Sequence, residues 1–146
     1  MSKPFGAVFA IVSFLFIAVL STGALAFDAK KDLSNQQTYD LMVKGELILI
    51  DVRTKPEWQQ SGIASDALTI TMQDPNFLTK IAQIRLENPD KTLAFICASG
   101  RRSSVVYNEL KKRGYKNIYS VFGGTTGNGV AGWIKDGFPV VKYEEN

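Results

Sequence analysis

Residues 92–103 have the sequence TLAFICASGRRS, and this stretch decides the fold. Its first five residues, Thr92 to Ile96, form an apolar run that is typical of a strand buried on both faces of a parallel sheet. Polar residues and Gly100 interrupt the run, and a helix is expected to begin near Ser103 and to end at Gly114. The stretch therefore predicts a buried strand, a tight loop that starts at Cys97, and a helix.

The same alternation continues on both sides of this stretch. Ser34 and Gln37 form a capping-box pattern for a helix that ends near Val43, and a second buried strand is predicted at 47–50. The remaining predictions are a loop or short helix around Pro56 to Trp58, strands at 67–70 and 118–122, a helix whose N-cap and first residue are Asp74 and Pro75, and a last helix at 130–135. Strands and helices that alternate in this way predict an α/β domain with a mostly parallel sheet.

Two of the predicted strands end in residues that can carry chemistry. Asp51 follows the strand at 47–50, and Cys97 follows the strand at 92–96. In open α/β sheets, ligands bind beyond the carboxyl ends of the strands. Both residues are therefore expected at one site.

Composition excludes several classes of chemistry. The chain has 146 residues with one Cys and no His, so an internal disulfide, a Ser-His-Asp triad, a Cys-His dyad and a His-based zinc site are all excluded. A metal would have to bind carboxylates alone. The length suits one globular domain.

The first 26 residues have the pattern of a secretory signal peptide. Lys3 precedes a long uncharged run, and Ala24 and Ala26 provide small residues for cleavage before Phe27. The alternative is an uncleaved membrane anchor, since the run is long enough to cross a bilayer. We expect a periplasmic or otherwise exported protein with residues 27–33 as a leader, a domain at 34–142 and a tail at 143–146.

The mature chain has too little net charge for nucleic-acid binding. Without Lys3, 16 of the 17 Lys and Arg remain against 14 Asp and Glu, which gives a net charge of +2. The one basic cluster, Lys111 to Arg113 with Lys116, closes a predicted helix, where cations complement the helix dipole. No nucleic-acid partner is expected, and a membrane would be a partner only through an uncleaved segment 1–26.

The setting of Cys97 favours a reactive thiolate. Backbone N–H groups of a tight loop can form an anion-binding nest, and the amino terminus of the following helix adds positive potential. Arg101 and Arg102 add two full positive charges, so a thiolate could be held without any His. The alternative is a buried Cys that acts as a small apolar residue, but such a Cys needs none of these features.

These residues resemble the single-domain rhodaneses, a family of sulfurtransferases. Residues 49–53 with Glu57 and Trp58 resemble the first family signature, and residues 97–103 resemble the active-site loop, with Gly at +3 and Arg at +5 from the Cys. Gly123 and Gly124, followed by Trp133, Gly137 and Pro139, resemble the carboxyl-terminal signature. The resemblance covers residues 34–141 and implies a three-layer α/β domain with a central, mostly parallel sheet of about five strands.

The resemblance also implies roles for individual residues. Cys97 would be the nucleophile that accepts sulfur, and the loop formed by Ala98, Ser99, Gly100, Arg101 and Arg102 would hold the persulfide and an anionic donor. Asp51 and Arg53 would support the loop, and Ser103 would either cap the helix or assist in the reaction. Trp58 and Trp133 are expected in the core or, as an alternative, in the wall of the pocket. The Gly-His-Ile segment usual after the Trp is replaced by Ser61, Gly62 and Ile63, without the His.

The function implied is transfer of sulfane sulfur from thiosulfate to cyanide or a thiol, with no metal or organic cofactor. One alternative is an exported sulfur carrier or redox partner that passes the same Cys97 persulfide to a protein acceptor. Another is a Cys-based phosphatase or arsenate reductase. Those enzymes carry Arg at +6 from the Cys, whereas Ser103 occupies that position here.

Overall fold

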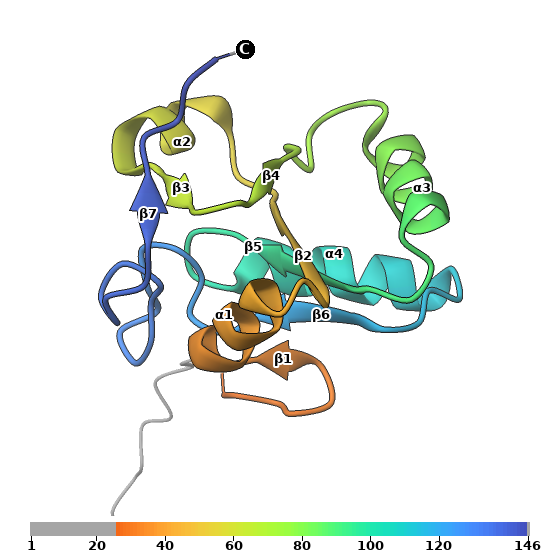
Figure 1. The fold of residues 1–146 in the computed structure, drawn as a ribbon, viewed down its shortest axis with the longest axis horizontal. Coiled ribbons are helices and arrows are strands. Elements are labelled where there is room, and N and C mark those ends of the chain that lie inside the picture. The colour runs from red at the N-terminus through yellow and green to blue at the C-terminus, as the bar shows by residue number, and fades with distance from the viewer. Residues whose placement is uncertain (1–25, 146) are drawn as a thin grey trace, which may run out of the picture.

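The computed structural model describes residues 26–145 and has a five-stranded parallel sheet at its centre. The strands are β1 (Asp32–Leu33), β2 (Leu47–Asp51), β4 (Leu68–Thr69), β5 (Thr92–Ile96) and β6 (Ile118–Val121), in the order β1-β6-β5-β2-β4. The helices are α1 (Asn35–Val43), α2 (Lys55–Ser61), α3 (Phe77–Glu87) and α4 (Arg101–Lys112). Figure 1 shows α1 and α4 on opposite sides of the sheet. The predicted α/β architecture is confirmed.

Two core clusters lie on the two faces of the sheet, because successive side chains of a strand point to opposite faces. Leu93, Phe95 and Cys97 pack with residues of α3 and α4, such as Ile81 and Val106. Ala94 and Ile96 lie in the other cluster with Trp133, against which side chains of α1 pack. Cys97 continues the alternation of β5, so its side chain belongs to the α3 and α4 face.

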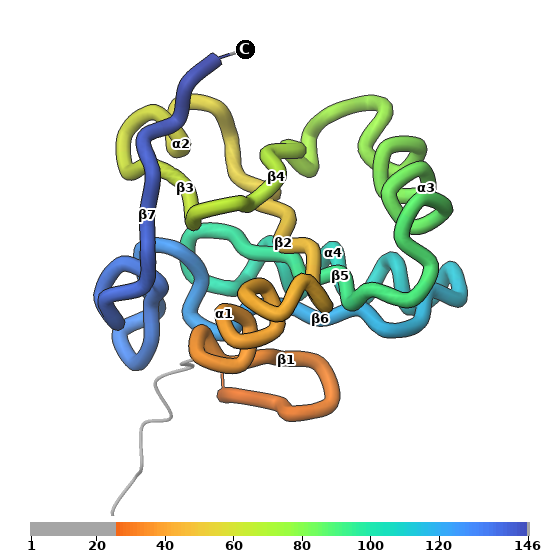
Figure 2. Tube along the Cα trace, viewed as in Figure 1, coloured from red at the N-terminus to blue at the C-terminus, as the bar shows by residue number. Residues whose placement is uncertain are grey.

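A second, two-stranded antiparallel sheet joins β3 (Ile63–Ala64) to β7 (Val140–Val141). Figure 2 shows β7 alongside β3 and close to α2. Gly62 lies between α2 and β3 and has φ +74°. A Cβ at this position would lie 2.6 Å from the Val141 carbonyl oxygen. Close packing of β7 therefore requires glycine at position 62, which corresponds to the His of the usual Gly-His-Ile segment.

Local signals were accurate for the cap of α1 and for the bounds of β5. Ser34 and Gln37 form the expected capping box of α1, and β5 has the predicted bounds. The tryptophans Trp58 and Trp133 are buried, as expected. The segment 27–33, expected as a leader, contains β1, which pairs in parallel with β6.

Two helix predictions need correction. Helix α3 begins at Phe77, because residues 74–76 form a turn in which the Asp74 side chain accepts the backbone N–H of Asn76. The helix predicted at 130–135 is wrong: the segment forms turns instead. The backbone N–H groups of Trp133 and Ile134 bond to the carbonyl oxygens of Gly124 and Thr125, and not to residues one helical turn earlier.

The predicted signal peptide, residues 1–26, lies outside the described residues except for Ala26. Within residues 26–145, no helix is long and apolar enough to span a membrane.

Candidate active site

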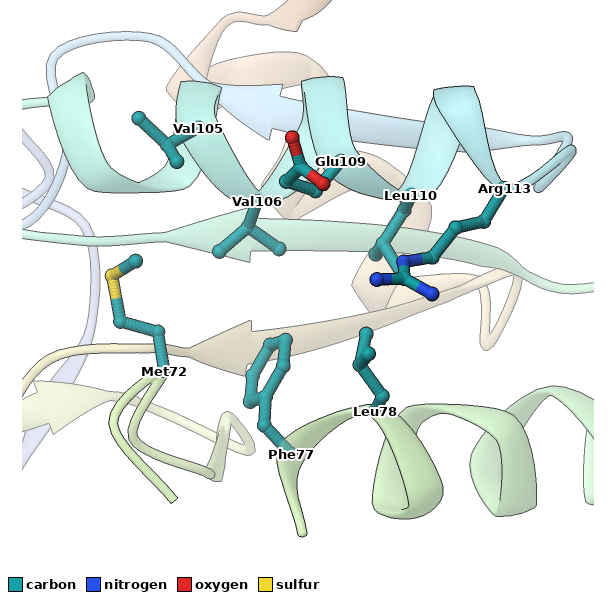
Figure 3. A pocket seen from close by; sticks show the side chains of 8 residues that line it. All are labelled: Met72, Phe77, Leu78, Val105, Val106, Glu109, Leu110 and Arg113. Atoms are coloured by element: carbon teal, nitrogen blue, oxygen red, sulfur yellow. The ribbon is translucent and has the colours of Figure 1, made fainter. Parts of the chain in front are cut away.

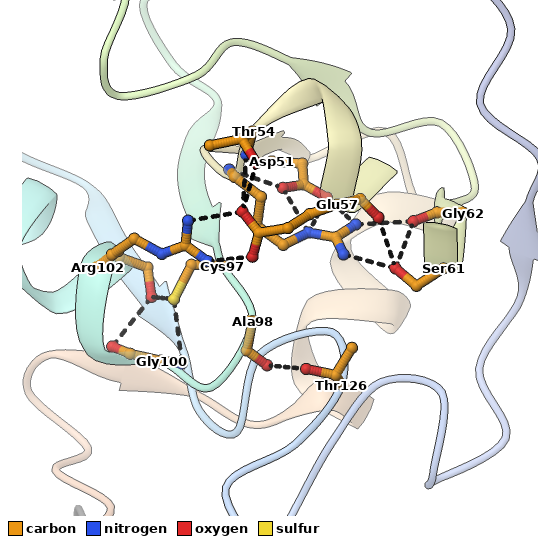
Figure 4. A network of polar contacts seen from close by, with 12 residues as sticks. Asp51, Thr54, Glu57, Ser61, Gly62, Cys97, Ala98, Gly100, Arg102 and Thr126 are labelled. Atoms are coloured by element: carbon orange, nitrogen blue, oxygen red, sulfur yellow. Dashed lines mark hydrogen bonds and ion pairs between the residues drawn. The ribbon is translucent and has the colours of Figure 1, made fainter. Parts of the chain in front are cut away.

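Cys97 directly follows β5 and lies at the start of a loop that leads into α4. Its side chain is 1% exposed, and the backbone N–H of Gly100 donates a hydrogen bond to its Sγ at 3.1 Å. Gly100 is the N-cap of α4 with φ +93°, a left-handed conformation that favours glycine. The loop therefore directs a backbone donor and the amino terminus of a twelve-residue helix toward the sulfur, as Figure 4 shows.

Ser103 lies beside the Cys97 sulfur. It is not the N-cap of α4, because the helix begins at Arg101, two residues earlier. Its Oγ is 3.5 Å from the Cys97 Sγ, 3.2 Å from the Gly100 carbonyl oxygen and 2.8 Å from the Oγ of Ser120. Ser120 comes from β6 and is buried. The loop is thus fastened to the neighbouring strand by two hydroxyl groups, a link that sequence reasoning missed.

The Gly123-Gly124 turn supports the loop from the other side. The backbone N–H of Thr125 donates to the Cys97 carbonyl oxygen at 2.7 Å, and those of Thr126 and Gly127 donate to the Ala98 carbonyl oxygen at 3.0 Å. A Cβ at Gly124 would lie 2.5 Å from the Cys97 carbonyl oxygen. The two signatures resembling the rhodaneses at 97–103 and 123–124 are therefore packed directly against each other.

Asp51 and Arg53 form a buried ion pair at the end of β2. Asp51 is 0% exposed and Arg53 1% exposed. The guanidinium donates to both Asp51 oxygens, at 2.7–3.0 Å, and also to the Ser61 Oγ and the Gly62 carbonyl oxygen, each at 2.7 Å. The pair thus connects the strand end to the carboxyl end of α2, and the Arg53 charge is compensated by Asp51.

Arg102 was expected to help hold an anionic donor. In the structure, its guanidinium is instead paired with the Glu57 carboxylate of α2. Its Nη1 donates to the Glu57 Oε2 at 2.8 Å, and its Nη2 donates to the Oε1. These bonds lower the pKa of Glu57 to about 2 and raise the pKa of Arg102. Arg101 is exposed and has no ion pair within residues 26–145. Glu57 was noted in the sequence only as part of a signature, because nothing local indicates a partner 45 residues away.

A surface cleft of about 400 Å³ opens beside the loop. Its lining residues are Arg53, Glu57, Gln60, Ser61, Ala98 and Thr126. Ser99 lies elsewhere, beside a much smaller space that it shares with Gly100, Ser104 and Ser120. A separate apolar groove of about 160 Å³ lies between α3 and α4 and contains Met72, Phe77 and Val105 (Figure 3). The cleft combines polar and charged side chains with Ala98, the neighbour of Cys97.

The described residues contain no cluster of three or more Cys, Asp or Glu side chains that could hold a metal ion. Arg53 and Glu57 line the cleft, and the buried Cys97, whose Sγ accepts a hydrogen bond from the Gly100 N–H, is the chain neighbour of the lining residue Ala98.

Comparison with known proteins agrees with this arrangement. Residues 34–128 match the model of the rhodanese-like domain. The chain is 30% identical over 117 residues to an uncharacterized protein of Rickettsia prowazekii, covering 75% of this chain and 95% of that protein. It is 27% identical over 94 residues to the thiosulfate sulfurtransferase GlpE of Coxiella burnetii, covering 64% of this chain and 82% of the relative. The crystal structure of a rhodanese-related protein from Thermoplasma volcanium superposes with a TM-score of 0.61 at 27% identity, covering 77% of this chain and 99% of that one.

Proposed function

Because the chain belongs to the rhodanese-like domain family, we propose that it is a sulfurtransferase that moves sulfane sulfur from thiosulfate to cyanide or a thiol through a persulfide on Cys97. The observation that carries the proposal is the 3.1 Å hydrogen bond from the Gly100 N–H to the Cys97 Sγ at the amino terminus of α4. The name of the Coxiella burnetii relative supports thiosulfate as the donor to test.

The first half-reaction uses the loop as an anion cradle. The Cys97 thiolate attacks the outer sulfur of thiosulfate, the S–S bond of the donor breaks, and sulfite leaves with the bonding electron pair. Cys97 then carries a persulfide whose terminal sulfur is anionic. Backbone N–H groups and the helix dipole stabilise that charge without a titrating residue, which suits a chain that contains no His.

The second half-reaction returns the thiolate. Cyanide attacks the terminal persulfide sulfur, thiocyanate leaves, and the electron pair of the S–S bond returns to the Cys97 sulfur. A thiol acceptor would follow the same course and leave as a persulfide. No metal or organic cofactor takes part in either step.

Intact-mass spectrometry of the purified protein tests this proposal. Incubation with thiosulfate should add one sulfur atom, cyanide should remove it, and Cys97→Ser should show no gain. If Cys97 reacts with an alkylating reagent but gains no sulfur from thiosulfate, the donor is wrong, and a protein persulfide should be tested instead. That outcome would favour a sulfur carrier that exchanges with a specific protein partner.

A phosphatase has less support from the site. Position +6 from the Cys is the buried Ser103, whose hydroxyl bonds to Gly100 and Ser120, so no guanidinium is available there to clamp a phosphate.

A further inference from the structure

Glu57 places a fixed negative charge in the cleft beside the Cys97 loop. Its Oε2 accepts hydrogen bonds from the Thr54 backbone N–H at 3.0 Å, from the Thr54 Oγ1 at 2.8 Å and from the Arg102 Nη1 at 2.8 Å. Its Oε1 accepts a further bond from the Arg102 Nη2. Four hydrogen bonds from two residues, Thr54 and Arg102, hold the carboxylate in place, as Figure 4 shows. These bonds orient the Glu57 carboxylate at the wall of the cleft.

The charges around the cleft are consequently almost balanced. Arg53 is compensated by Asp51, and Arg102 is compensated by Glu57. Among the described residues of the Cys97 loop, this leaves Arg101 as the one cation without an ion-pair partner. Arg101 does not line the cleft, and the two charged residues that do, Arg53 and Glu57, are both paired. A second negative charge on a donor therefore meets the Glu57 carboxylate without a free cation in the cleft to offset it.

We propose that Glu57 is a specificity-determining residue that makes the cleft discriminate against dianionic sulfur donors and in favour of donors with a single negative charge. The proposal rests on the sulfurtransferase function proposed above and defines the substrate class of the same site. Thiosulfate is a dianion, whereas an organic thiosulfonate or a persulfide carries one charge. Glu57 therefore weakens the binding of thiosulfate relative to that of a donor with one charge.

The chemical step is the same for both kinds of donor. With methanethiosulfonate, the Cys97 thiolate attacks the terminal sulfur, the S–S bond to the sulfonyl sulfur breaks, and methanesulfinate leaves with the electron pair. The Cys97 persulfide formed is identical to that formed from thiosulfate. The two donors therefore differ at this site in charge and in the group that occupies the cleft.

Glu57→Gln isolates the charge. The Gln carbonyl oxygen can occupy the Oε2 position and accept the bonds from Thr54 and from the Arg102 Nη1, whereas the Gln amide NH2 and the Arg102 Nη2 are both donors and must move apart. Gln also serves as the third residue of a capping box. Glu109→Gln is the matched control: Glu109 is an exposed carboxylate of α4 that pairs with Lys112 and lines the separate apolar groove (Figure 3).

The first measurement does not depend on sulfur transfer. The ratio of the alkylation rates of Cys97 with iodoacetate and with iodoacetamide reports the local potential, because the two reagents differ by one charge. In buffer of low ionic strength, Glu57→Gln should raise this ratio about fivefold, as Coulomb's law gives for one charge at roughly 8 Å with an effective dielectric constant of about 40. Glu109→Gln should leave it unchanged. An equal ratio in both variants and the parent would overturn the proposal.

The second measurement compares the two donors. Glu57→Gln should lower KM for thiosulfate about fivefold more than KM for methanethiosulfonate, because thiosulfate carries one more charge. A raised alkylation ratio with equal changes in both KM values would show that Glu57 sets the potential but not the specificity, which also overturns the proposal. If neither donor loads Cys97 in any variant while the alkylation ratio rises as expected, the sulfurtransferase function fails and the electrostatic role of Glu57 stands.

Discussion

Replacing Arg53 with Met should destabilise the fold by about 3–5 kcal/mol, because it leaves the Asp51 carboxylate buried without its cation. The parent chain holds this carboxylate at 0% exposure. After the substitution, the Asp51 carboxylate keeps one of its described hydrogen bonds, the one from the backbone N–H of residue 53 to the Oδ1 at 3.0 Å. The Gly62 carbonyl oxygen also loses its bond from the guanidinium. A loss of this size is a large part of the roughly 5–15 kcal/mol that stabilises a typical domain.

Chemical denaturation followed by tryptophan fluorescence measures the effect. Trp58 and Trp133 are both buried, so their emission should change on unfolding. The double variant Asp51→Leu with Arg53→Met removes both charges and should regain at least half of the loss, since apolar replacement of a buried ion pair is often neutral. A loss below about 1 kcal/mol for Arg53→Met, or strictly additive effects in the double variant, would refute the idea that the pair acts as a buried structural link.

Three further outcomes are expected. Gly124→Ala should cost about 2 kcal/mol or more in denaturation and change the alkylation rate of Cys97, because its Cβ would lie 2.5 Å from the Cys97 carbonyl oxygen. Gly45→Ala, with a similar φ of +71° and no atom within 4 Å, should cost only about 1–2 kcal/mol and leave alkylation unchanged. Since the pKa of Glu57 falls from 4.5 to about 2 on folding, its ion pair should stabilise the protein fully above pH 4.5 and lose this effect as the pH falls toward 2. Glu57→Gln should therefore flatten the plot of unfolding free energy against pH in that range. Parallel plots for the variant and the parent would contradict the role given to this ion pair. Expression in an exporting host should yield a mature chain that begins at Phe27, and amino-terminal sequencing that finds Lys3 retained would favour the membrane anchor instead.

Local sequence signals were reliable where a few adjacent residues decide the conformation. The apolar runs of β2 and β5 favour strands that are buried on both faces, and both strands lie where the runs do. The Ser34 cap closes on a residue three positions away. The Gly100 turn needs only the absence of a Cβ. These features placed Cys97 at a strand end, in front of a helix.

The same reasoning failed where backbone or side-chain partners are distant in the sequence. Residues 130–135 form turns because their N–H groups bond to the Gly124 and Thr125 carbonyl oxygens. Two-residue strands such as β1 carry no periodicity, and β1 exists because β6 lies beside it.

The sequence by itself thus determined the α/β class, the loop around Cys97 and the resemblance to the rhodaneses, because each depends on short local patterns and on their order along the chain. Only the tertiary structure decided the charge of the site. Arg101 and Arg102 are adjacent and alike in the sequence, yet the packing of α2 against the loop gives Arg102 a carboxylate partner and leaves Arg101 exposed. Electrostatic interactions depend on distance in space, and that distance is fixed only when segments 45 residues apart meet at one edge of the sheet.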